Sequence, residues 1–243
     1  MLNVECAGQT EILAYHGWGF TAACWQDYET AFAKTTWQSF DRGYFGKPQS
    51  VQFSAAGLES CRRVVIAHSY GLHLCPDAVL AQTDVLILLN SFLGFHGVEP
   101  RLQAQSQRKL QRMRQAFDQH PAQTWLNFII KTFAPDPLPL DYLISTFSTN
   151  PRSNPQPDRL HRSLLKQDLE ALDQTTPNAD RWRSIPRILL LTSPDDRILM
   201  APLQPSDLPD AAVTEIRLPH GGHGAPFAQS NYCIARISEF LDF

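Results

Sequence analysis

A serine in a tight turn is the first residue of this chain that could do chemistry. Ser69 stands in the segment Ala67-His68-Ser69-Tyr70-Gly71, between a short apolar run and residues that favour a helix. A strand-to-helix turn presents a nucleophile when small residues stand two positions before and after it, because the tight backbone leaves no room for larger side chains. Ala67 and Gly71 meet this requirement. By itself the segment is as typical of an ordinary turn, so a nucleophilic Ser69 needs partners elsewhere in the chain.

An acid and a histidine that could activate this serine follow later in the chain. Asp195 and Asp196 come after one apolar run, and His220 and His223 lie in a glycine-rich loop after the next. In such a site the histidine removes the hydroxyl proton and the carboxylate holds the imidazole in the right tautomer. We favour Asp196, because Ile198 is the branched apolar residue expected two positions after the acid, and His223, because glycines flank it. Asp195 and His220 remain alternatives.

Backbone amides could supply the third part of the chemistry. The segment His16-Gly17-Trp18-Gly19 directly follows the apolar run Glu11 to Tyr15. The amides of Trp18 and Tyr70 are therefore candidates for an oxyanion hole, in which each donor contributes about 3 kcal/mol to stabilising the transition state. A generic His-Gly turn is the alternative interpretation of this segment.

Each of these candidates follows a segment that is predicted to be a strand. Short apolar runs with few polar interruptions are typical of strands that are buried on both faces of a parallel sheet. Helix-like segments, including Asn231 to Leu241, alternate with them, which predicts a layered α/β domain. The predicted strands are Glu11 to Tyr15, Arg63 to Ala67, Asp84 to Leu89, Arg187 to Thr192 and Val213 to Leu218.

The alternation stops between the third and fourth strands, where no strand is predicted. We expect residues 97–183 to form an inserted helical cap, and residues 1–96 and 184–243 to form the core. Prolines mark the connections within the insertion, as expected where helices end and the chain changes direction. The predicted cap helices are Arg101 to His120, Thr124 to Phe133 and Arg159 to Leu172.

Basic residues on the first and third cap helices predict an acidic partner. The first helix carries five cations and no acid before Asp118. Such a surface would steer an acidic protein by electrostatic attraction, although a solvated helix face is the alternative. Aromatic residues of the second helix could line an acyl channel, or simply belong to the core. The expected partner-binding residues are Arg108, Arg112, Arg114, Arg159 and Arg162, and the expected channel residues are Trp125 and Phe128.

The overall composition excludes several classes of function. A net charge of −3 gives no basic field that would attract nucleic acid or an anionic membrane. Neither a leader segment nor a membrane-spanning apolar stretch is expected, which predicts a cytoplasmic protein. Five cysteines without a C-x-x-C pair fit neither a disulfide framework nor a zinc site.

Three segments give the chain a resemblance to a known family. It is similar to the pimeloyl-(acyl-carrier protein) methyl ester carboxylesterases of biotin synthesis and to related α/β-hydrolases. The similarity rests on His16-Gly17-Trp18-Gly19 followed by Trp25, on Phe40-Asp41-Arg42-Gly43-Tyr44-Phe45-Gly46, and on His223-Gly224-Ala225-Pro226-Phe227. The chain departs from the family at three places. Ala67 stands where the family has Gly, and a single glycine follows Tyr70 where the family has two. Leu199-Met200 stands where the family has Val-Pro.

The resemblance implies an α/β-hydrolase fold and a serine carboxylesterase that needs no metal or cofactor. Ser69 would attack the methyl ester of a carrier-bound acyl chain, with His223 as base, Asp196 as its partner and an acyl-carrier protein as the binding partner. A carboxylesterase or thioesterase for small acyl groups would use the same residues. A catalytically silent binding protein is a further alternative.

Overall fold

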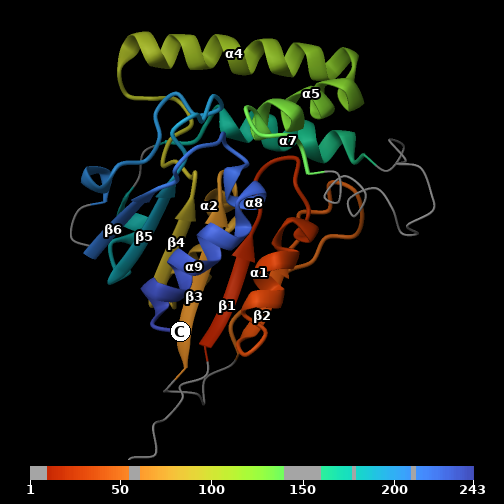
Figure 1. Cartoon of the computed structure of the whole chain (residues 1–243). Helices are drawn as coiled ribbons and strands as arrows, with labels where there is room; N and C mark the ends of the chain where they lie inside the picture. Colours follow the sequence, from red (N-terminus) through yellow and green to blue (C-terminus); the bar gives the residue numbers. More distant parts are fainter. Residues whose placement is uncertain (1–9, 55–60, 140–159, 177–178, 209–211) are drawn as a thin grey trace, which may run out of the picture.

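Strands of a single parallel sheet form the centre of the protein. The computed structural model describes residues 10–54, 61–139, 160–176, 179–208 and 212–243. Within these residues, six strands lie in the order β2-β1-β3-β4-β5-β6, all parallel (Figure 1). The strands are β1 (Thr10–Tyr15), β2 (Thr36–Phe40), β3 (Arg62–His68), β4 (Val85–Leu89), β5 (Arg187–Thr192) and β6 (Ala212–Arg217).

The five strands predicted from apolar runs are confirmed, with ends that differ by one residue at most. Strand β2, by contrast, was not among them. It lies at the edge of the sheet, and its residues are half-buried or exposed. An edge strand needs no continuous apolar run, so Trp37 and Phe40, separated by polar residues, gave too weak a pattern.

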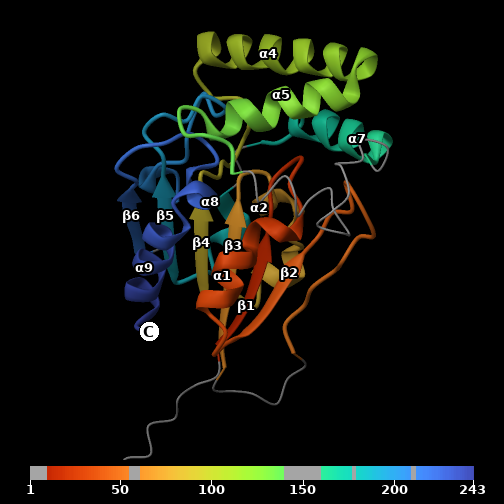
Figure 2. The same cartoon turned by 45° about the vertical axis from the view of Figure 1, so that its right-hand side comes forward.

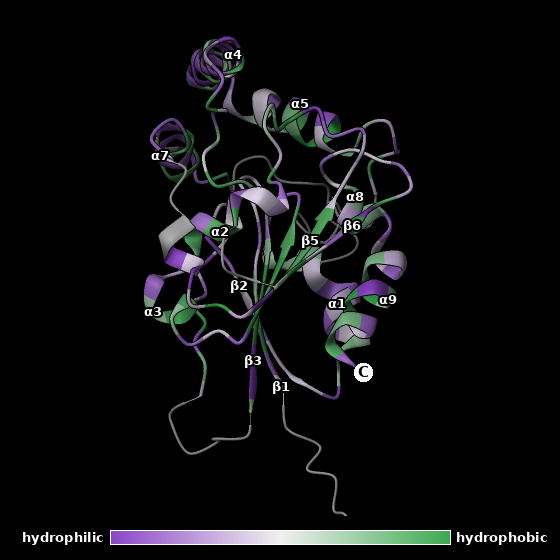
Figure 3. Cartoon of the chain, turned by 90° about the vertical axis from the view of Figure 1, so that its left-hand side faces the viewer, coloured by the Kyte–Doolittle hydropathy of each residue, from purple (hydrophilic) through white to green (hydrophobic). Residues whose placement is uncertain are grey.

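Both faces of the sheet are covered by helices (Figure 3). Successive side chains of a strand point to opposite faces. Ile66 of β3 therefore packs on the side of α1 (Gln26–Ala31) and α9 (Ser230–Leu241). Val65 packs on the opposite side, with the core that includes side chains of α2 (Gly71–Leu74) and α3 (Asp77–Leu80). This arrangement is the α/β layering that the sequence predicts.

Three helices lie above the carboxyl edge of the sheet (Figures 1 and 2). The Glu99 side chain caps α4 by accepting hydrogen bonds from the first amides of the helix, and Pro100 occupies the first turn, where its missing N–H costs nothing. The predicted cap helices are confirmed, although the third begins at Arg162, and Arg159 lies outside the described residues. The three helices are α4 (Pro100–Gln119), α5 (Pro121–Phe133) and α7 (Arg162–Leu172).

A buried carboxylate attaches α7 to the loop that follows β2. Asp168 accepts hydrogen bonds from Arg42 Nε and Nη2 at 2.8 and 2.9 Å, and from the Tyr44 hydroxyl at 2.7 Å. Hydrogen bonding to Asp168 is also the main cause that raises the pKa of Arg42. A bidentate pair of this kind fixes orientation as well as distance. It therefore holds α7 in register with the core.

Asp168→Ala should lower the free energy of unfolding substantially, because it leaves the Arg42 guanidinium and the buried Tyr44 hydroxyl without their acceptor. We expect a loss of about 3 kcal/mol, the lower end for a broken buried ion pair, since Arg42 is partly exposed. Urea denaturation followed by circular dichroism measures it. The control is Lys166→Met, also on α7, which breaks an exposed pair with Asp118 of α4 and should change stability little. Equal losses in the two variants would contradict this role of Asp168.

Candidate active site

Ser69 stands on a strained turn at the carboxyl end of β3. Its φ angle is 53°, in the left-handed region that residues other than glycine rarely adopt. Two residues later the backbone passes against the end of β1, where a Cβ atom on Gly71 would lie 2.2 Å from the Tyr15 carbonyl oxygen. No side chain fits there, which is the physical reason for the small residue that the sequence pattern requires.

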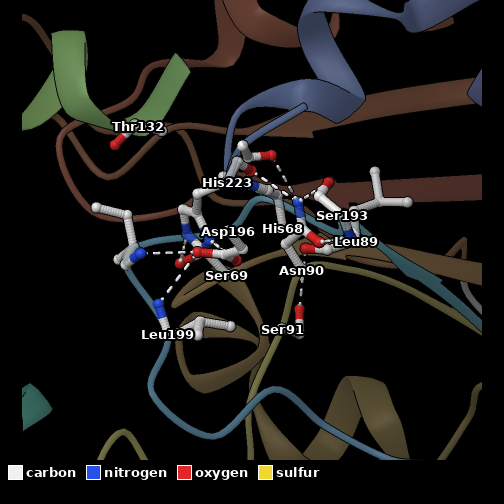
Figure 4. A network of polar contacts seen from close by, with 12 residues as sticks. His68, Ser69, Leu89, Asn90, Ser91, Thr132, Ser193, Asp196, Leu199 and His223 are labelled. Carbon is white, nitrogen blue, oxygen red and sulfur yellow. Dashed lines mark hydrogen bonds and ion pairs between the residues drawn. The ribbon is translucent and has the colours of Figure 1, made fainter. Parts of the chain in front are cut away.

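A line of hydrogen bonds connects Ser69 with His223 and Asp196 (Figure 4). His223 Nε2 lies 2.8 Å from Ser69 Oγ, and His223 Nδ1 lies 2.6 Å from Asp196 Oδ2. An ionised carboxylate can only accept, so Nδ1 carries the proton and Nε2 accepts from the serine hydroxyl. The Ser69 proton is thereby directed at the atom that could remove it.

Asp196 is held in its ionised form. Its other oxygen, Oδ1, accepts hydrogen bonds from the amides of Ile198 at 2.8 Å and Leu199 at 3.1 Å. Burial by itself raises the pKa of Asp196, but the electrostatic attraction and the hydrogen bond of the His223 imidazole, together with these two amides, outweigh burial and lower the pKa. The carboxylate can therefore stabilise a positive charge on the imidazole.

The structure places the two alternative residues elsewhere. The Asp195 carboxylate accepts a hydrogen bond from the Gly221 amide at 3.1 Å and thus supports the histidine loop. His220 is 61% exposed, and its Nδ1 lies 3.5 Å from Asp136 Oδ1. Of the two acids and two histidines considered, Asp196 and His223 are the pair brought together with Ser69.

The loop after β1 lies directly beside the serine. Strands β1 and β3 are neighbours at the point where the strand order reverses, which is where parallel sheets commonly form their sites. A Cβ atom on Gly17 would come within 3.0 Å of Ser69 Cβ, so the two backbones are almost in contact. The glycine permits this close approach.

His16 fixes the direction of the amide that follows Gly17. Its Nε2 accepts from the Arg42 amide at 3.1 Å, so Nδ1 carries the proton and donates to Gly17 O at 2.9 Å. Burial lowers the pKa of His16, in agreement with a neutral ring. Because a trans peptide directs its C=O and N–H to opposite sides, the Trp18 N–H points away from this bonded carbonyl.

The amides of Trp18 and Tyr70 are available to bind an oxyanion. No backbone or side-chain acceptor is found for either of them in the part of the chain that the structure describes. The loop is held from above by the cap, since the Trp18 indole donates to Leu165 O at 2.9 Å and the Trp125 indole to Gly19 O at 2.8 Å. These contacts keep the loop rigid beside Ser69.

Two further residues, to which the sequence analysis gave no role, position the histidine loop. The His223 carbonyl accepts hydrogen bonds from His68 Nε2 at 3.0 Å and from Asn90 Nδ2 at 2.8 Å (Figure 4). Asn90 also accepts from the Ser193 amide at 2.8 Å, so it joins the histidine loop to the acid loop. Both residues stand at or just after the carboxyl end of a predicted strand, and that position was the signal available in the sequence.

Comparison with known proteins identifies the family to which this chain belongs. A sequence model of the alpha/beta hydrolase family matches residues 12–231. The chain belongs to the alpha/beta hydrolase family. The search of curated proteins found no match.

Solved structures share the fold of this alpha/beta hydrolase at low sequence identity. The hydrolase olei00960 from Oleispira antarctica superposes with a TM-score of 0.66 at 13% identity, covering 97% of this chain and 92% of that one. The esterase EaEST from Exiguobacterium antarcticum has a TM-score of 0.65 at 11% identity, and the match covers 97% of this chain and 93% of that one. An enol-lactonase from Burkholderia xenovorans LB400 has a TM-score of 0.61 at 14% identity, and the match covers 98% of this chain and 94% of that one. Identities this low establish the fold alone.

A small cavity of about 30 Å³ opens at Ser69, between the core of this alpha/beta hydrolase and its cap. Phe128 of α5 lies in its wall, as the channel hypothesis expects. Trp125 corrects that hypothesis, because it is 3% exposed, does not line this cavity, and donates from its indole to the loop after β1. Aromatic residues at helical spacing can face a cavity or the protein core, so the sequence could not show that Phe128 lines the cavity while Trp125 does not.

The basic residues of the cap have different surroundings. Arg114 forms ion pairs with Asp173 at 3.2 Å and Glu170 at 3.7 Å, so its charge already has partners within the cap. Arg108, Arg112 and Arg162 are exposed.

Neither a metal centre nor a membrane span is found among the described residues. These residues contain no cluster of three or more histidine, cysteine, aspartate or glutamate side chains that could hold a metal ion. In the same residues, no helix has the length and apolar character needed to cross a membrane.

Labelling with a fluorophosphonate should modify Ser69 and depend on His223 but not on His220. His223→Ala removes the base, so the labelling rate should fall by about a hundredfold or more. His220→Ala should retain the rate, since that ring makes no contact with Ser69. Mass spectrometry of the labelled peptide measures the labelling rates of the two variants, with Ser69→Ala as the unlabelled control. Loss of labelling in His220→Ala with retention in His223→Ala would reverse the assignment.

Proposed function

We propose that this alpha/beta hydrolase is a serine carboxylesterase that works through an acyl-serine intermediate. The observation that carries the proposal is the line of hydrogen bonds from Asp196 through His223 to Ser69, beside two amides that have no acceptor among the described residues. Membership of the family supports hydrolysis as the reaction class. A silent binding protein would not need this complete set.

In the first half of the reaction, His223 Nε2 takes the Ser69 proton while Oγ attacks the ester carbonyl. The carbonyl oxygen becomes an oxyanion and is bound by the amides of Trp18 and Tyr70. Asp196 stabilises the positive imidazole that forms. His223 then gives its proton to the leaving alcohol oxygen, the carbon–oxygen bond breaks, and the acyl group stays on Ser69.

In the second half, water replaces the alcohol. His223 removes a proton from the water as its oxygen attacks the acyl carbonyl, and the same two amides bind the new oxyanion. Collapse of this intermediate returns the proton from His223 to Ser69 and releases the acid. Every step uses side chains and amides that already lie within reach of Ser69, so no metal or cofactor enters the mechanism.

For the substrate we propose the methyl ester of a carrier-bound pimeloyl chain, with an acyl-carrier protein as partner. The resemblance of the three core segments supports this choice. Arg101, Arg108 and Arg112 support it too, because they fall on one side of α4 at positions i, i+7 and i+11 and are exposed. An acidic carrier would be attracted to this stripe.

A carboxylesterase for small acyl groups is the second candidate. The cavity at Ser69 has room for only a few atoms, which suits a small acyl group as well as the end of a long one. The esterase from Exiguobacterium antarcticum shares the fold. The same catalytic residues would serve both substrates.

Comparing two substrates separates these candidates. Wild-type protein should hydrolyse the carrier-bound pimeloyl methyl ester with a higher kcat/KM than p-nitrophenyl butyrate. Ser69→Ala should lose both activities, with kcat lower by about 10⁴ to 10⁶. The paired charge reversal Arg101→Glu/Arg108→Glu should raise KM for the carrier-bound ester by about tenfold, because it removes the electrostatic attraction, and should affect the short ester much less.

A higher kcat/KM for the short ester would contradict the carrier-bound substrate and favour the second candidate. Equal effects of the charge reversal on both esters would contradict the carrier-binding role of α4. Full activity of Ser69→Ala would contradict the esterase mechanism itself.

A further inference from the structure

A larger cavity between α4 and α5 adjoins the space beside Ser69. The inner cavity measures about 30 Å³ and the outer cavity about 340 Å³. Five side chains line both of them, so the two spaces adjoin: Phe95, Leu110, Met113, Phe128 and Ile198. Because the inner cavity is smaller than an ester substrate, most of a molecule bound at Ser69 must extend into the outer cavity.

Cationic side chains stand on the otherwise mainly apolar wall of the outer cavity. Lys109 and Arg112 come from α4 and Lys131 from α5, and no carboxylate is found among the described residues that line it. Lys109 Nζ lies 3.0 Å from the sulfur of Met200, which is a weak acceptor. None of the three cations forms an ion pair with a described residue. The described residues that line the cavity therefore carry a net positive charge, which the Asp196 carboxylate opposes in part at Lys131.

Two other basic residues of the cap have acidic partners. Arg114 pairs with Asp173, and Lys166 pairs with Asp118 at 2.5 Å. Lys109 and Lys131 instead repel each other. Burial lowers the pKa of Lys131, and the positive charge of Lys109 lowers it further. A bound anion would relieve this repulsion and would find donors from two helices at once.

We propose that the outer cavity is an anion subsite, which binds a carboxylate or phosphate at the far end of an acyl chain whose ester lies at Ser69. This inference rests on the proposed esterase function, since it takes Ser69 as the point of attack. The shared apolar wall accommodates the chain, and the cations bind its end. A free diacid monoester would present a carboxylate at the end of its chain. A carrier-linked chain ends in a thioester and would present the phosphate of the arm that joins this thioester to the carrier.

Matched chromogenic esters test the subsite. The neutral ester is p-nitrophenyl heptanoate, and the charged ones are mono-p-nitrophenyl pimelate and p-nitrophenyl 7-phosphonoheptanoate. Wild-type protein should prefer a charged ester by about tenfold in kcat/KM, the effect of one charge-assisted hydrogen bond. A preference for the carboxylate identifies a diacid monoester as the substrate type, and a preference for the phosphonate identifies a phosphate-bearing one.

The variant Lys109→Met/Arg112→Met/Lys131→Met should abolish the preference, because methionine keeps much of the apolar stem and removes the charge. The matched control Lys34→Met/Lys47→Met/Arg217→Met removes three exposed cations elsewhere and should keep it. Equal ratios of charged to neutral kcat/KM in wild type and the cavity variant would overturn the subsite.

Binding to Ser69→Ala separates this inference from the esterase proposal, because it requires no turnover. Isothermal titration calorimetry should show that monomethyl pimelate binds more tightly than methyl heptanoate, and that the cavity substitutions remove the difference. If these results hold while no ester is hydrolysed by the wild type, the subsite stands and the esterase proposal fails. If the two esters bind alike, the subsite is wrong whatever the activity.

Discussion

The close approach of Gly71 to the end of β1 is the constraint on which the site depends. The Tyr15 carbonyl occupies the place where a side chain at position 71 would be. This contact brings the first turn of α2 against the neighbouring strand, and it leaves Ser69 with a positive φ angle at the edge of the sheet. The loop after β1 then lies beside the serine, because β1 and β3 are adjacent. Nucleophile and oxyanion donors are thus placed by backbone packing before any catalytic side chain is considered.

The cap contributes to that placement as well as covering the site. Indole groups at Trp18 and Trp125 connect the loop after β1 with α7 and α5. The last turn of α5 supports the histidine loop, since the Gly224 amide donates to Thr132 O at 2.8 Å. The cap helices that would contact substrate therefore also hold the backbone that would bind the oxyanion. A substitution that loosens the cap should affect chemistry and substrate binding together.

The sequence predicted the parts of this site that depend on local pattern. Apolar runs identified the four inner strands and the edge strand β6, and small residues around Ser69 identified the turn. The preference for Asp196 and His223 agrees with the hydrogen bonds that reach Ser69. Strand β2 was missed, because a half-exposed edge strand lacks the continuous apolar run of a buried one.

The sequence placed His68 and Asn90 at the ends of predicted strands, but their bonding partner could not be predicted, for a different physical reason. Both donate to the backbone carbonyl of His223, more than a hundred residues away in the chain, and a backbone acceptor leaves no trace in the sequence. Trp125 shows a similar limit. Its spacing places it on a buried face of α5, but only the folded chain shows that this face meets Gly19 O and not the cavity.

An acyl group on Ser69 is the central claim of this account, and trapping it is the most direct test. The protein would be mixed with p-nitrophenyl butyrate, quenched in acid during turnover, digested, and analysed by mass spectrometry. The account predicts a butyryl group on the peptide that contains Ser69, absent from the Ser69→Ala variant. Ester hydrolysis that continues in Ser69→Ala, or a butyryl group found on another residue and never on Ser69, would contradict it.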